Sequence, residues 1–361
     1  NLRVFFVCLT IRMFAARHAC IRRRLFGRHH HPLGARGHHQ VVCRDGVLVS
    51  TSMGAKEMMA EGGGRGSGRG AYTTARTVAG GTRVVAFDFH VQRLNDTAAA
   101  LSAESGDSDG PAGRDRAPLS RKRVAATLAA AFQHFRQTRG REEQRRDDEL
   151  RSTLYYHPCD AAAGTVLAGT SEDSDDDQPR DGSPLYCHVE ALPPRPSGNI
   201  VVEVMGRPRE NPLAKNVDWI HARKSLEARR GADVHEVVLV SEDGQAAIEG
   251  TQTNFFAVMR DGTVYTAGAG VLEGSIRKIV LDICQRHDIP FRLEPPRMTD
   301  LVHGWAGAFL TSTSRLLLPV DEVRVPVDSE AWSAAAARGE TEELVSGERG
   351  GEERLQAKQP V

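Results

Sequence analysis

The chain has 361 residues, of which 26% are charged and 40% hydrophobic, with 47 basic and 47 acidic side chains. This length suffices for two medium-sized domains, each with its own core. A formal net charge of zero argues against a nucleic-acid binder that is steered by a positive field. No stretch has the roughly 18 apolar residues of a membrane-spanning helix. We therefore expect neither a nucleic-acid nor a membrane partner.

The charge is distributed unevenly. Residues 1–44 contain nine arginines, six of the 14 histidines and no acidic residue, so the rest of the chain has 38 basic against 47 acidic residues, a charge of −9. A basic, acid-free leader of this kind predicts an organelle transit peptide, for a chloroplast or a mitochondrion, with a cytoplasmic protein as the other possibility. A disordered basic tail is the alternative. The leader's histidines lack acidic or cysteine partners and the six cysteines show no paired spacing, so we expect no metal site.

Polar segments interrupt the remaining chain. The Gly-rich run at 61–70 follows no predicted strand and lacks the glycine spacing of a dinucleotide-binding loop. The acidic runs at 102–118 and 171–184 are typical of surface loops or disordered insertions. Between these segments we expect ordered islands of a first folded region, followed by a second folded region at about 206–328 and then a charged tail. The islands lie at 71–101, 120–137, 153–168 and 185–205, and the tail at 331–361.

The second folded region has clear periodic patterns. WIHARKSLEARRG predicts a helix that ends at Gly231, and GSIRKIVLDICQRH predicts an amphipathic helix. Turns at EDGQ and RDG predict two hairpins, HEVVLVS with AAIE and FFAVM with TVYTA, and AGAFLTSTS and VRVPV predict further strands. Helices mixed with antiparallel hairpins indicate an α+β fold. The second helix should bury one side, made of Ile276, Ile279, Val280 and Ile283, and the core should include Phe255, Phe256, Trp305 and Phe309.

The stretch EGTQTNFFAVMRDGTVYTAGAGVLEGSIRK at 249–278 resembles the signature of the class IV aminotransferases. These are pyridoxal-phosphate enzymes of fold type IV, which include branched-chain and D-amino-acid aminotransferases and aminodeoxychorismate lyase. Further matches follow in the family's order, and the resemblance is closest to a plant and algal branch. It implies an N-terminal α+β domain at 46–205 and a C-terminal cofactor domain at 206–330. The further matches are GAYTTARTV, FHVQRL, AKNVDW and AFLTSTSRLLLPV.

The resemblance implies a pyridoxal 5'-phosphate-dependent aminotransferase of amino-acid metabolism. Such an enzyme passes an amino group between an amino acid and a 2-oxo acid through an aldimine with a lysine. By the same resemblance we expect a homodimer. Two alternatives stay open: a lyase of the aminodeoxychorismate type on the same cofactor, and a non-catalytic binding or scaffold descendant of the fold.

Pyridoxal chemistry requires a primary amine, and only six of the 47 basic residues are lysines. The resemblance assigns the cofactor to Lys215 of AKNVDW, which is followed by Asp218 and Trp219, and makes this lysine the catalytic base and acid. Lys224 is the rival. It falls among charged residues of the predicted helix, where a solvent-facing lysine is the simpler interpretation.

The cofactor's pyridine nitrogen needs a carboxylate that keeps it protonated, and the resemblance assigns Glu249. Its phosphate needs backbone N–H groups at a helix start, hydroxyls and a cation. Here the family's Ile-Thr pair is replaced by Ser-Ile, and Glu273 stands where the family has proline. The expected phosphate ligands are Gly274, Ser275 and Ile276 at the helix start, Ser312 and Thr313 from LTSTS, and Arg93 from HVQRL.

An amino-acid substrate brings a carboxylate that requires arginine or amide donors. Tyr72, Thr74 and Arg76 alternate along one predicted strand, so they share a face, and the resembling enzymes line their substrate pocket from this strand. Strand packing with a surface arginine is the alternative interpretation. Ser314 adjoins the expected phosphate ligands and is a further substrate candidate. We expect His90 to be a structural residue at a helix start rather than a base.

Overall fold

The computed structural model describes residues 39–62, 70–104, 118–139, 149–156, 183–327, 329–338, 345–349 and 352–358. These residues form two compact units. Unit 2 holds the described residues up to Pro194 together with Ala214–Ala222, and unit 1 holds Arg195–Leu213 and the chain from Arg223 onward. The segment Ala214–Ala222, which the sequence assigns to the second domain, therefore packs with the first.

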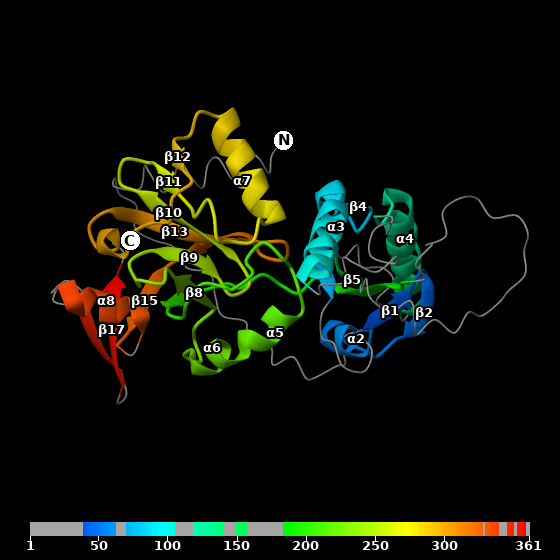
Figure 1. Ribbon diagram of the computed structural model, residues 1–361, viewed down its shortest axis with the longest axis horizontal. Helices are drawn as coiled ribbons and strands as arrows, with labels where there is room; N and C mark the ends of the chain where they lie inside the picture. Colours follow the sequence, from blue (N-terminus) through cyan, green and yellow to red (C-terminus); the bar gives the residue numbers. More distant parts are fainter. Residues whose placement is uncertain are drawn as a thin grey trace, which may run out of the picture. The chain divides into compact units, whose positions relative to one another are not determined.

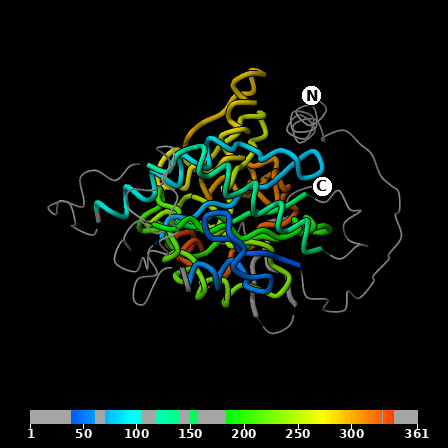
Figure 2. Tube along the Cα trace, turned by 90° about the vertical axis from the view of Figure 1, so that its right-hand side faces the viewer, coloured from blue at the N-terminus to red at the C-terminus, as the bar shows by residue number. Residues whose placement is uncertain are grey.

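Unit 2 is built on a six-stranded sheet of order β2-β1-β6-β5-β3-β4, with antiparallel pairing throughout. Helices α3 and α4 lie on one face of this sheet and α2 lies on the other (Figure 1 and Figure 2). The strands are β1 (Gln40–Arg44), β2 (Val47–Ser50), β3 (Ala71–Val78), β4 (Arg83–Val84), β5 (Leu150–Tyr156) and β6 (Leu185–Ala191). The helices are α2 (Ala55–Gly62), α3 (Phe87–Glu104), α4 (Arg121–Thr138) and α5 (Asp218–Ala222).

Local chemistry explains where these elements begin. Asp45 and Gly46 both have positive φ, as a two-residue hairpin turn between β1 and β2 requires. Ser120 caps α4 by accepting a hydrogen bond from Arg123 N at 3.1 Å. The hydrophobic face of α4 then packs on the sheet. This face consists of Val124, Leu128, Ala131 and Phe135.

Unit 1 is built on a mixed sheet, in which β7 runs parallel to both β8 and β15 while the hairpins are antiparallel. Its main path is β12-β11-β10-β9-β8-β7-β15-β17-β16, and β13 pairs with β10 and β14. The strands are β7 (Val201–Val204), β8 (Glu236–Val240), β9 (Ala247–Gly250), β10 (Asn254–Met259), β11 (Val264–Tyr265), β12 (Phe291–Arg292), β13 (Trp305–Ser312), β14 (Leu316–Val320), β15 (Glu322–Pro326), β16 (Val345–Arg349) and β17 (Glu352–Lys358). The helices are α6 (Lys224–Arg229), α7 (Ser275–Arg286), the short 3-10 helix η3 (Met298–Asp300) and α8 (Glu330–Arg338).

Most patterned predictions are confirmed in unit 1. The two hairpins form as β8–β9 and β10–β11, and the predicted strands form as β13 and β15. The four predicted core aromatics are at most 1% exposed, and Phe256 stacks on Phe309 with ring centroids 4.6 Å apart. The mixture of helices and antiparallel hairpins is the expected α+β architecture.

Several expected boundaries differ in the structure. The basic leader was expected to reach residue 44, whereas β1 is a strand with Val41, Val42 and Cys43 fully buried. The single helix predicted over 219–231 is two short helices, α5 and α6, because the chain passes from unit 2 to unit 1 at Arg223. Ile279, which was predicted to be buried, is 37% exposed, because the buried face of α7 includes Arg277 and Cys284 instead.

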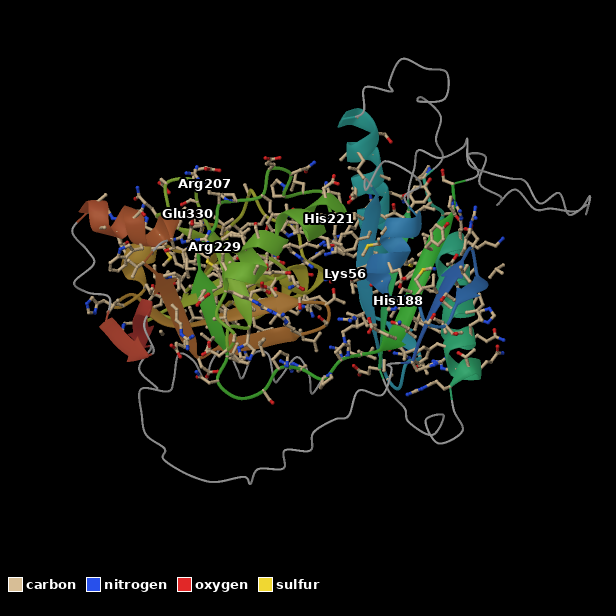
Figure 3. The ribbon with its side chains drawn as sticks, turned by 90° about the horizontal axis from the view of Figure 1, so that it is seen from below. Lys56, His188, Arg207, His221, Arg229 and Glu330 are labelled. Carbon is tan, nitrogen blue, oxygen red and sulfur yellow. The ribbon has the colours of Figure 1, made fainter. Side chains whose placement is uncertain are left out.

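The expected charged tail also contributes structure. Helix α8 extends into this tail from Glu330, the residue just before it, and Glu330 accepts a hydrogen bond from Gly206 N at 2.7 Å, so α8 is attached to the segment that follows β7 (Figure 3). Farther along, β17 pairs antiparallel with β15, and β16 with β17. Residues 1–38, most of the Gly-rich run, most of the acidic run at 102–118 and residues 171–182 of the acidic run at 171–184 lie outside the described residues. Within the described part, no helix is long and apolar enough to cross a bilayer.

Candidate active site

Lys215 lies in unit 2, where its main chain is held on both sides. Its N–H donates to Thr97 Oγ1 of α3 at 3.3 Å, and its carbonyl accepts from Tyr72 N of β3 at 3.0 Å. The next residue, Asn216, forms a β-bridge with Ala71. Because β4 pairs with the far end of β3, at Thr77 and Val78, this segment takes up the near end of the same strand. The fold therefore fixes the backbone from which the lysine side chain extends.

The side chain of Lys215 is half-buried and meets an aromatic ring. Its Nζ lies 4.7 Å from the centroid of Tyr72, a cation–π distance. Arg93 is 9% exposed on α3 and lies over Phe89 at 4.5 Å. The structure thus brings together three of the predicted residues, Tyr72, Arg93 and Lys215, within unit 2.

His90 belongs to the same cluster. It is 1% exposed, and its Nδ1 lies 2.8 Å from Thr73 Oγ1. Burial, followed by the nearby charges of Arg93 and Lys215, lowers the pKa of His90 to about 3. The imidazole is therefore neutral at physiological pH. This agrees with its expected structural role, because a neutral ring adds no third positive charge beside the two cations.

The rival lysine has a different environment. Lys224 is exposed on α6 in unit 1, with the charged neighbours that the sequence indicated. A lysine that serves pyridoxal chemistry has to be shielded from bulk water and held in place. The half-buried, doubly anchored Lys215 meets this requirement better.

The predicted substrate strand is β3. Tyr72 packs with Met58, Met59 and Val217 on the face that α2 covers, and Thr74 is half-buried two residues on. Arg76 is buried and pairs with Glu149, the residue just before β5. This ion pair gives Arg76 a structural role that the sequence did not reveal, and its burial differs from the surface arginine of the strand-packing alternative.

Glu249 is buried within unit 1, with 2% of its surface exposed. Its Oε2 accepts from Leu272 N at 3.0 Å, and its Oε1 lies 3.6 Å from Arg209 Nη1. Arg277 is also close enough to interact: burial lowers the pKa of its guanidinium, while Glu273 and Glu249 oppose that shift. The Leu272 N–H donor and the guanidinium of Arg209, together with the charge of Arg277, compensate the charge of this buried carboxylate. The carboxylate of Glu249 is therefore suited to accept a further hydrogen bond from a cationic N–H donor, such as a protonated pyridine nitrogen.

The start of α7 has the features of an anion site. Gly274 is its N-cap residue and provides no capping side chain, and the first intrahelical bond runs from Lys278 N to Gly274 O. The early N–H groups of the helix therefore point outward without a capping partner from Gly274. Ser275 Oγ lies 3.3 Å from Thr313 Oγ1, so two hydroxyls converge at the same helix end.

Close packing shapes this helix start. A Cβ built on Gly274 would lie 2.0 Å from Asn254 Oδ1, while Asn254 Nδ2 donates to Leu272 O at 2.6 Å. Only glycine allows the loop to approach Asn254 so closely. Ile276 is buried, so its amide rather than its side chain is suited to an anion, and Glu273 is exposed. The N–H groups and hydroxyls present here fit the phosphate of pyridoxal phosphate despite the exchanged Ser-Ile pair.

Ser312 and Ser314 lie at the turn between β13 and β14. Ser312 Oγ accepts from Arg315 N at 3.2 Å, which closes the turn, and Ser314 is half-buried beside it. Ser312 therefore shapes the loop that carries Thr313. Its hydroxyl keeps its own proton for donation to an anion.

Sequence reasoning missed four residues: Thr97, Arg209, Asn254 and Arg277. Thr97 follows Arg93 by one helical turn, which places it on the same face of α3. That spacing could have indicated a shared environment, but its partner Lys215 is 118 residues away. Arg277 lies inside the predicted amphipathic helix, where its charge suggested an exposed side chain. Arg209 sits in a loop that offers no pattern.

Comparisons with known proteins agree with this chemistry. The family model described as "Amino-transferase class IV" matches residues 70–323. No curated protein matches the chain significantly. In the described residues no cluster of three or more histidine, cysteine, aspartate or glutamate side chains suits a metal ion.

Solved structures give the same fold. A hypothetical aminotransferase from Mycobacterium tuberculosis in its PLP-bound form is 21% identical, with 79% of this chain and 90% of that chain covered and a TM-score of 0.53. A putative branched-chain amino acid aminotransferase from Thermotoga maritima is 20% identical, with coverages of 79% and 87% and a TM-score of 0.53. The branched-chain aminotransferase of Thermoproteus uzoniensis with norvaline is 18% identical, with coverages of 85% and 97% and a TM-score of 0.52.

Proposed function

Since the chain belongs to the class IV aminotransferases, which are pyridoxal-phosphate enzymes, we propose that Lys215 is the residue that holds the cofactor and moves the substrate's proton. The observation that carries this assignment is the anchoring of the Lys215 main chain by Thr97 Oγ1 and Tyr72 N. An amine on a fixed backbone can return to the same position at each turnover. Lys224, by contrast, is exposed on α6.

The cofactor, when bound, supplies an electron sink for the charge that develops at the substrate's Cα. Lys215 then acts as base and acid at that carbon, with its amine over the Tyr72 ring. Because the imidazole of His90 is neutral, it adds no positive charge to those of Lys215 and Arg93 nearby. A lower local charge favours a lysine amine that can take up a proton again after each transfer.

We assign the remaining cofactor contacts residue by residue. Glu249, held by Leu272 N and flanked by Arg209, keeps the proton on the pyridine nitrogen. The phosphate is held by the amides of the α7 start, by hydroxyls of the β13–β14 turn and by one guanidinium. These phosphate ligands are Gly274, Ser275, Ile276, Ser312, Thr313 and Arg93.

The substrates we propose are an amino acid and a 2-oxo acid, with Tyr72, Thr74 and Ser314 as pocket residues. Arg76 was a fourth candidate, but its ion pair with Glu149 supports a structural role instead. The family match and the aminotransferase neighbours favour transamination over the lyase and over a non-catalytic descendant.

One experiment tests the function directly. Purified protein is mixed with pyridoxal phosphate, and then with single amino acids plus 2-oxoglutarate, and glutamate formation is measured. We expect a visible absorbance band from the bound cofactor, and glutamate with at least one donor. Pyruvate released from aminodeoxychorismate in the absence of an amino donor would indicate the lyase. The absence of an absorbance band would contradict cofactor binding.

Assembly and location are further parts of the proposal. The family resemblance supports a homodimer, which analytical ultracentrifugation of the purified protein would detect as a species of twice the chain mass. The arginine-rich leader, with nine arginines and no acidic residue in residues 1–44, supports import into an organelle. A fluorescent fusion of residues 1–38 should enter chloroplasts or mitochondria, and a cytosolic signal would contradict that part.

A further inference from the structure

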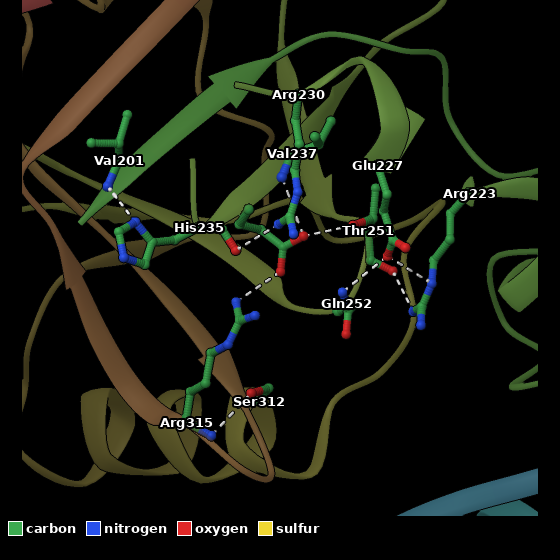
Figure 4. A network of polar contacts seen from close by, with 11 residues as sticks. Val201, Arg223, Glu227, Arg230, His235, Val237, Thr251, Gln252, Ser312 and Arg315 are labelled. Atoms are coloured by element: carbon green, nitrogen blue, oxygen red, sulfur yellow. Dashed lines mark hydrogen bonds and ion pairs between the residues drawn. The ribbon is translucent and has the colours of Figure 1, made fainter. Parts of the chain in front are cut away.

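Glu236 of β8 is a buried carboxylate outside the assigned cofactor ligands. Its side chain is 1% exposed, and both of its carboxylate oxygens accept hydrogen bonds from protein groups. Oε1 accepts from Thr251 Oγ1 at 2.6 Å and from Val237 N at 3.2 Å, and Oε2 accepts from Arg315 Nη1 at 2.9 Å. Thr251 and Arg315 approach this carboxylate from two different loops (Figure 4). A fully buried charge is tolerated only with partners of this quality.

The first loop joins β9 to β10 and begins at Thr251, two residues after Glu249. Thr251 N donates to Val237 O at 2.9 Å, and Thr251 O accepts from Arg223 Nη1 at 3.4 Å. A Cβ on Gly250 would lie 3.0 Å from Glu236 Cγ and 2.1 Å from Thr253 Oγ1. This loop is therefore packed against Glu236 and is held by backbone contacts as well.

The second loop is the β13–β14 turn, which carries Thr313. Here Leu316 has a φ of 57°, a left-handed conformation that residues with a Cβ adopt at a cost. Such a conformation persists only where surrounding contacts hold it. Besides the β13–β14 pairing of Ser312 with Leu316, two contacts of Arg315 hold this turn: its N–H donates to Ser312 Oγ, and its guanidinium pairs with Glu236.

We propose that Glu236 is a positioning residue that holds the strained β13–β14 turn, through Arg315, in the conformation that presents Thr313 to the cofactor's phosphate. This inference rests on the proposed function for the identity of the bound anion. The turn would otherwise relax away from Ser275, since Leu316 favours another conformation. Glu236 thereby controls the phosphate contact without touching the cofactor.

Glu236→Gln isolates this effect. The glutamine carbonyl still accepts from Thr251 and Val237, so the β9–β10 loop keeps its support. Only the charge that attracts Arg315 is lost, and Arg315, whose side chain is 19% exposed, can turn toward solvent. Arg315→Gln removes the same ion pair from the more exposed partner. Arg315→Gln is the variant to measure if Glu236→Gln prevents folding.

Two ligands report on the phosphate contact: pyridoxal 5'-phosphate and pyridoxal, which lacks the phosphate. We expect Glu236→Gln and Arg315→Gln to weaken pyridoxal phosphate binding about tenfold and pyridoxal binding less than about twofold, where a tenfold change corresponds to about 1.4 kcal/mol. Amide hydrogen exchange at 312–316 in the cofactor-free protein should become faster. The matched control is Glu203→Gln, because Glu203 is equally buried on the neighbouring strand β7 and binds Gly231 N instead.

An equal loss of affinity for both ligands would overturn the proposal, since it indicates general damage to the unit. Unchanged exchange at 312–316 would overturn it as well, because the turn would then hold without Glu236. If the unsubstituted protein binds neither ligand, the proposed function fails. The exchange measurement then still decides whether Glu236 holds the turn.

Discussion

Lys215 and Glu249 each take part in a hydrogen bond that a main-chain N–H donates to a side chain, but the two bonds span very different distances along the sequence. The carboxylate of Glu249 accepts from Leu272, 23 residues away, inside one continuous motif. The N–H of Lys215 donates to Thr97, 118 residues away. The lysine region of unit 2 therefore depends on tertiary structure, whereas the contact that orients the carboxylate of Glu249 lies within a single hairpin-and-helix segment of unit 1. Substitutions should accordingly act differently in the two regions.

The largest effect is expected at the lysine. Lys215→Ala should lower transaminase turnover by at least about a thousandfold, because the base and acid at Cα is lost. The measurement is kcat with the best amino donor found. Lys224→Ala is the matched control and should leave kcat unchanged, since Lys224 is exposed on α6. Loss of activity in Lys224→Ala alone would reverse the assignment.

Glu249→Gln should have the next largest effect, about a hundredfold on kcat. The amide can still accept from Leu272 N, so the loop geometry is kept, but it cannot hold a proton on the pyridine nitrogen. The absorbance spectrum of the bound cofactor should shift with the loss of that proton. Glu203→Gln, another buried glutamate, should leave both unchanged. A Glu249→Gln enzyme with normal kcat would remove Glu249 from the site.

Gly274→Ala tests the carboxylate region through packing. The new Cβ would meet Asn254 Oδ1 at 2.0 Å, which costs roughly 1–3 kcal/mol as the helix start shifts. We expect weaker cofactor binding in titrations and a lower Tm. Gly54→Ala is the control, because a Cβ there meets no atom within 4 Å. Equal behaviour of the two variants would show that the helix start is less tightly packed than described.

The region around Lys215 in unit 2 should become less stable as the pH falls. His90 has a pKa of about 3 in the fold against about 6.5 when unfolded, so between these values the unfolded chain binds more protons. The lowered pKa of His90 has no effect on stability above about pH 6.5. Below that pH, the free energy of unfolding falls by up to about 1.4 kcal/mol per pH unit. Burial also lowers the pKa of His188 on β6, which adds to the same trend (Figure 3).

Urea unfolding at pH 5.5 and 7.5 measures this dependence. His90→Gln removes one titrating group, so the difference in unfolding free energy between the two pH values should shrink. An unchanged difference would mean that the pKa of His90 is not lowered in the fold, contrary to its burial and to the nearby charges of Arg93 and Lys215.

Thr97→Val should have the smallest effect, about fivefold on kcat, in line with the loss of one hydrogen bond worth about 1 kcal/mol. The substitution keeps the side-chain shape but leaves Lys215 N without its acceptor. Thr127→Val on α4, also buried in unit 2, is the control. No difference between the two variants would mean that Tyr72 N is sufficient to anchor the lysine.

The same contrast explains what the sequence could predict. The hairpins around EDGQ and RDG and the helix α7 follow from local alternation and turn residues, so their predicted bounds lie close to the observed ones. The ion pair of Arg76 with Glu149 joins residues 73 apart and leaves no local signal. The strand β1 is hidden in the sequence because its valines follow a basic leader. Likewise β17 joins the sheet through backbone bonds to β15, which no side-chain pattern in a charged tail could indicate.

The placement of Ala214–Ala222 in unit 2 is the clearest case. The lysine motif stands in the sequence next to the carboxylate motif, yet it pairs with β3 and α3. Tertiary contacts, such as those of Lys215 with Thr97 and Tyr72, reveal this placement, and no local pattern indicates it.

The central claim, that Lys215 holds the cofactor, has a direct test. The protein is loaded with pyridoxal phosphate, reduced with borohydride and digested, and the labelled peptide is identified by mass spectrometry. We predict a single label on Lys215 within AKNVDW. A label on Lys224, or on no lysine at all, would contradict the account.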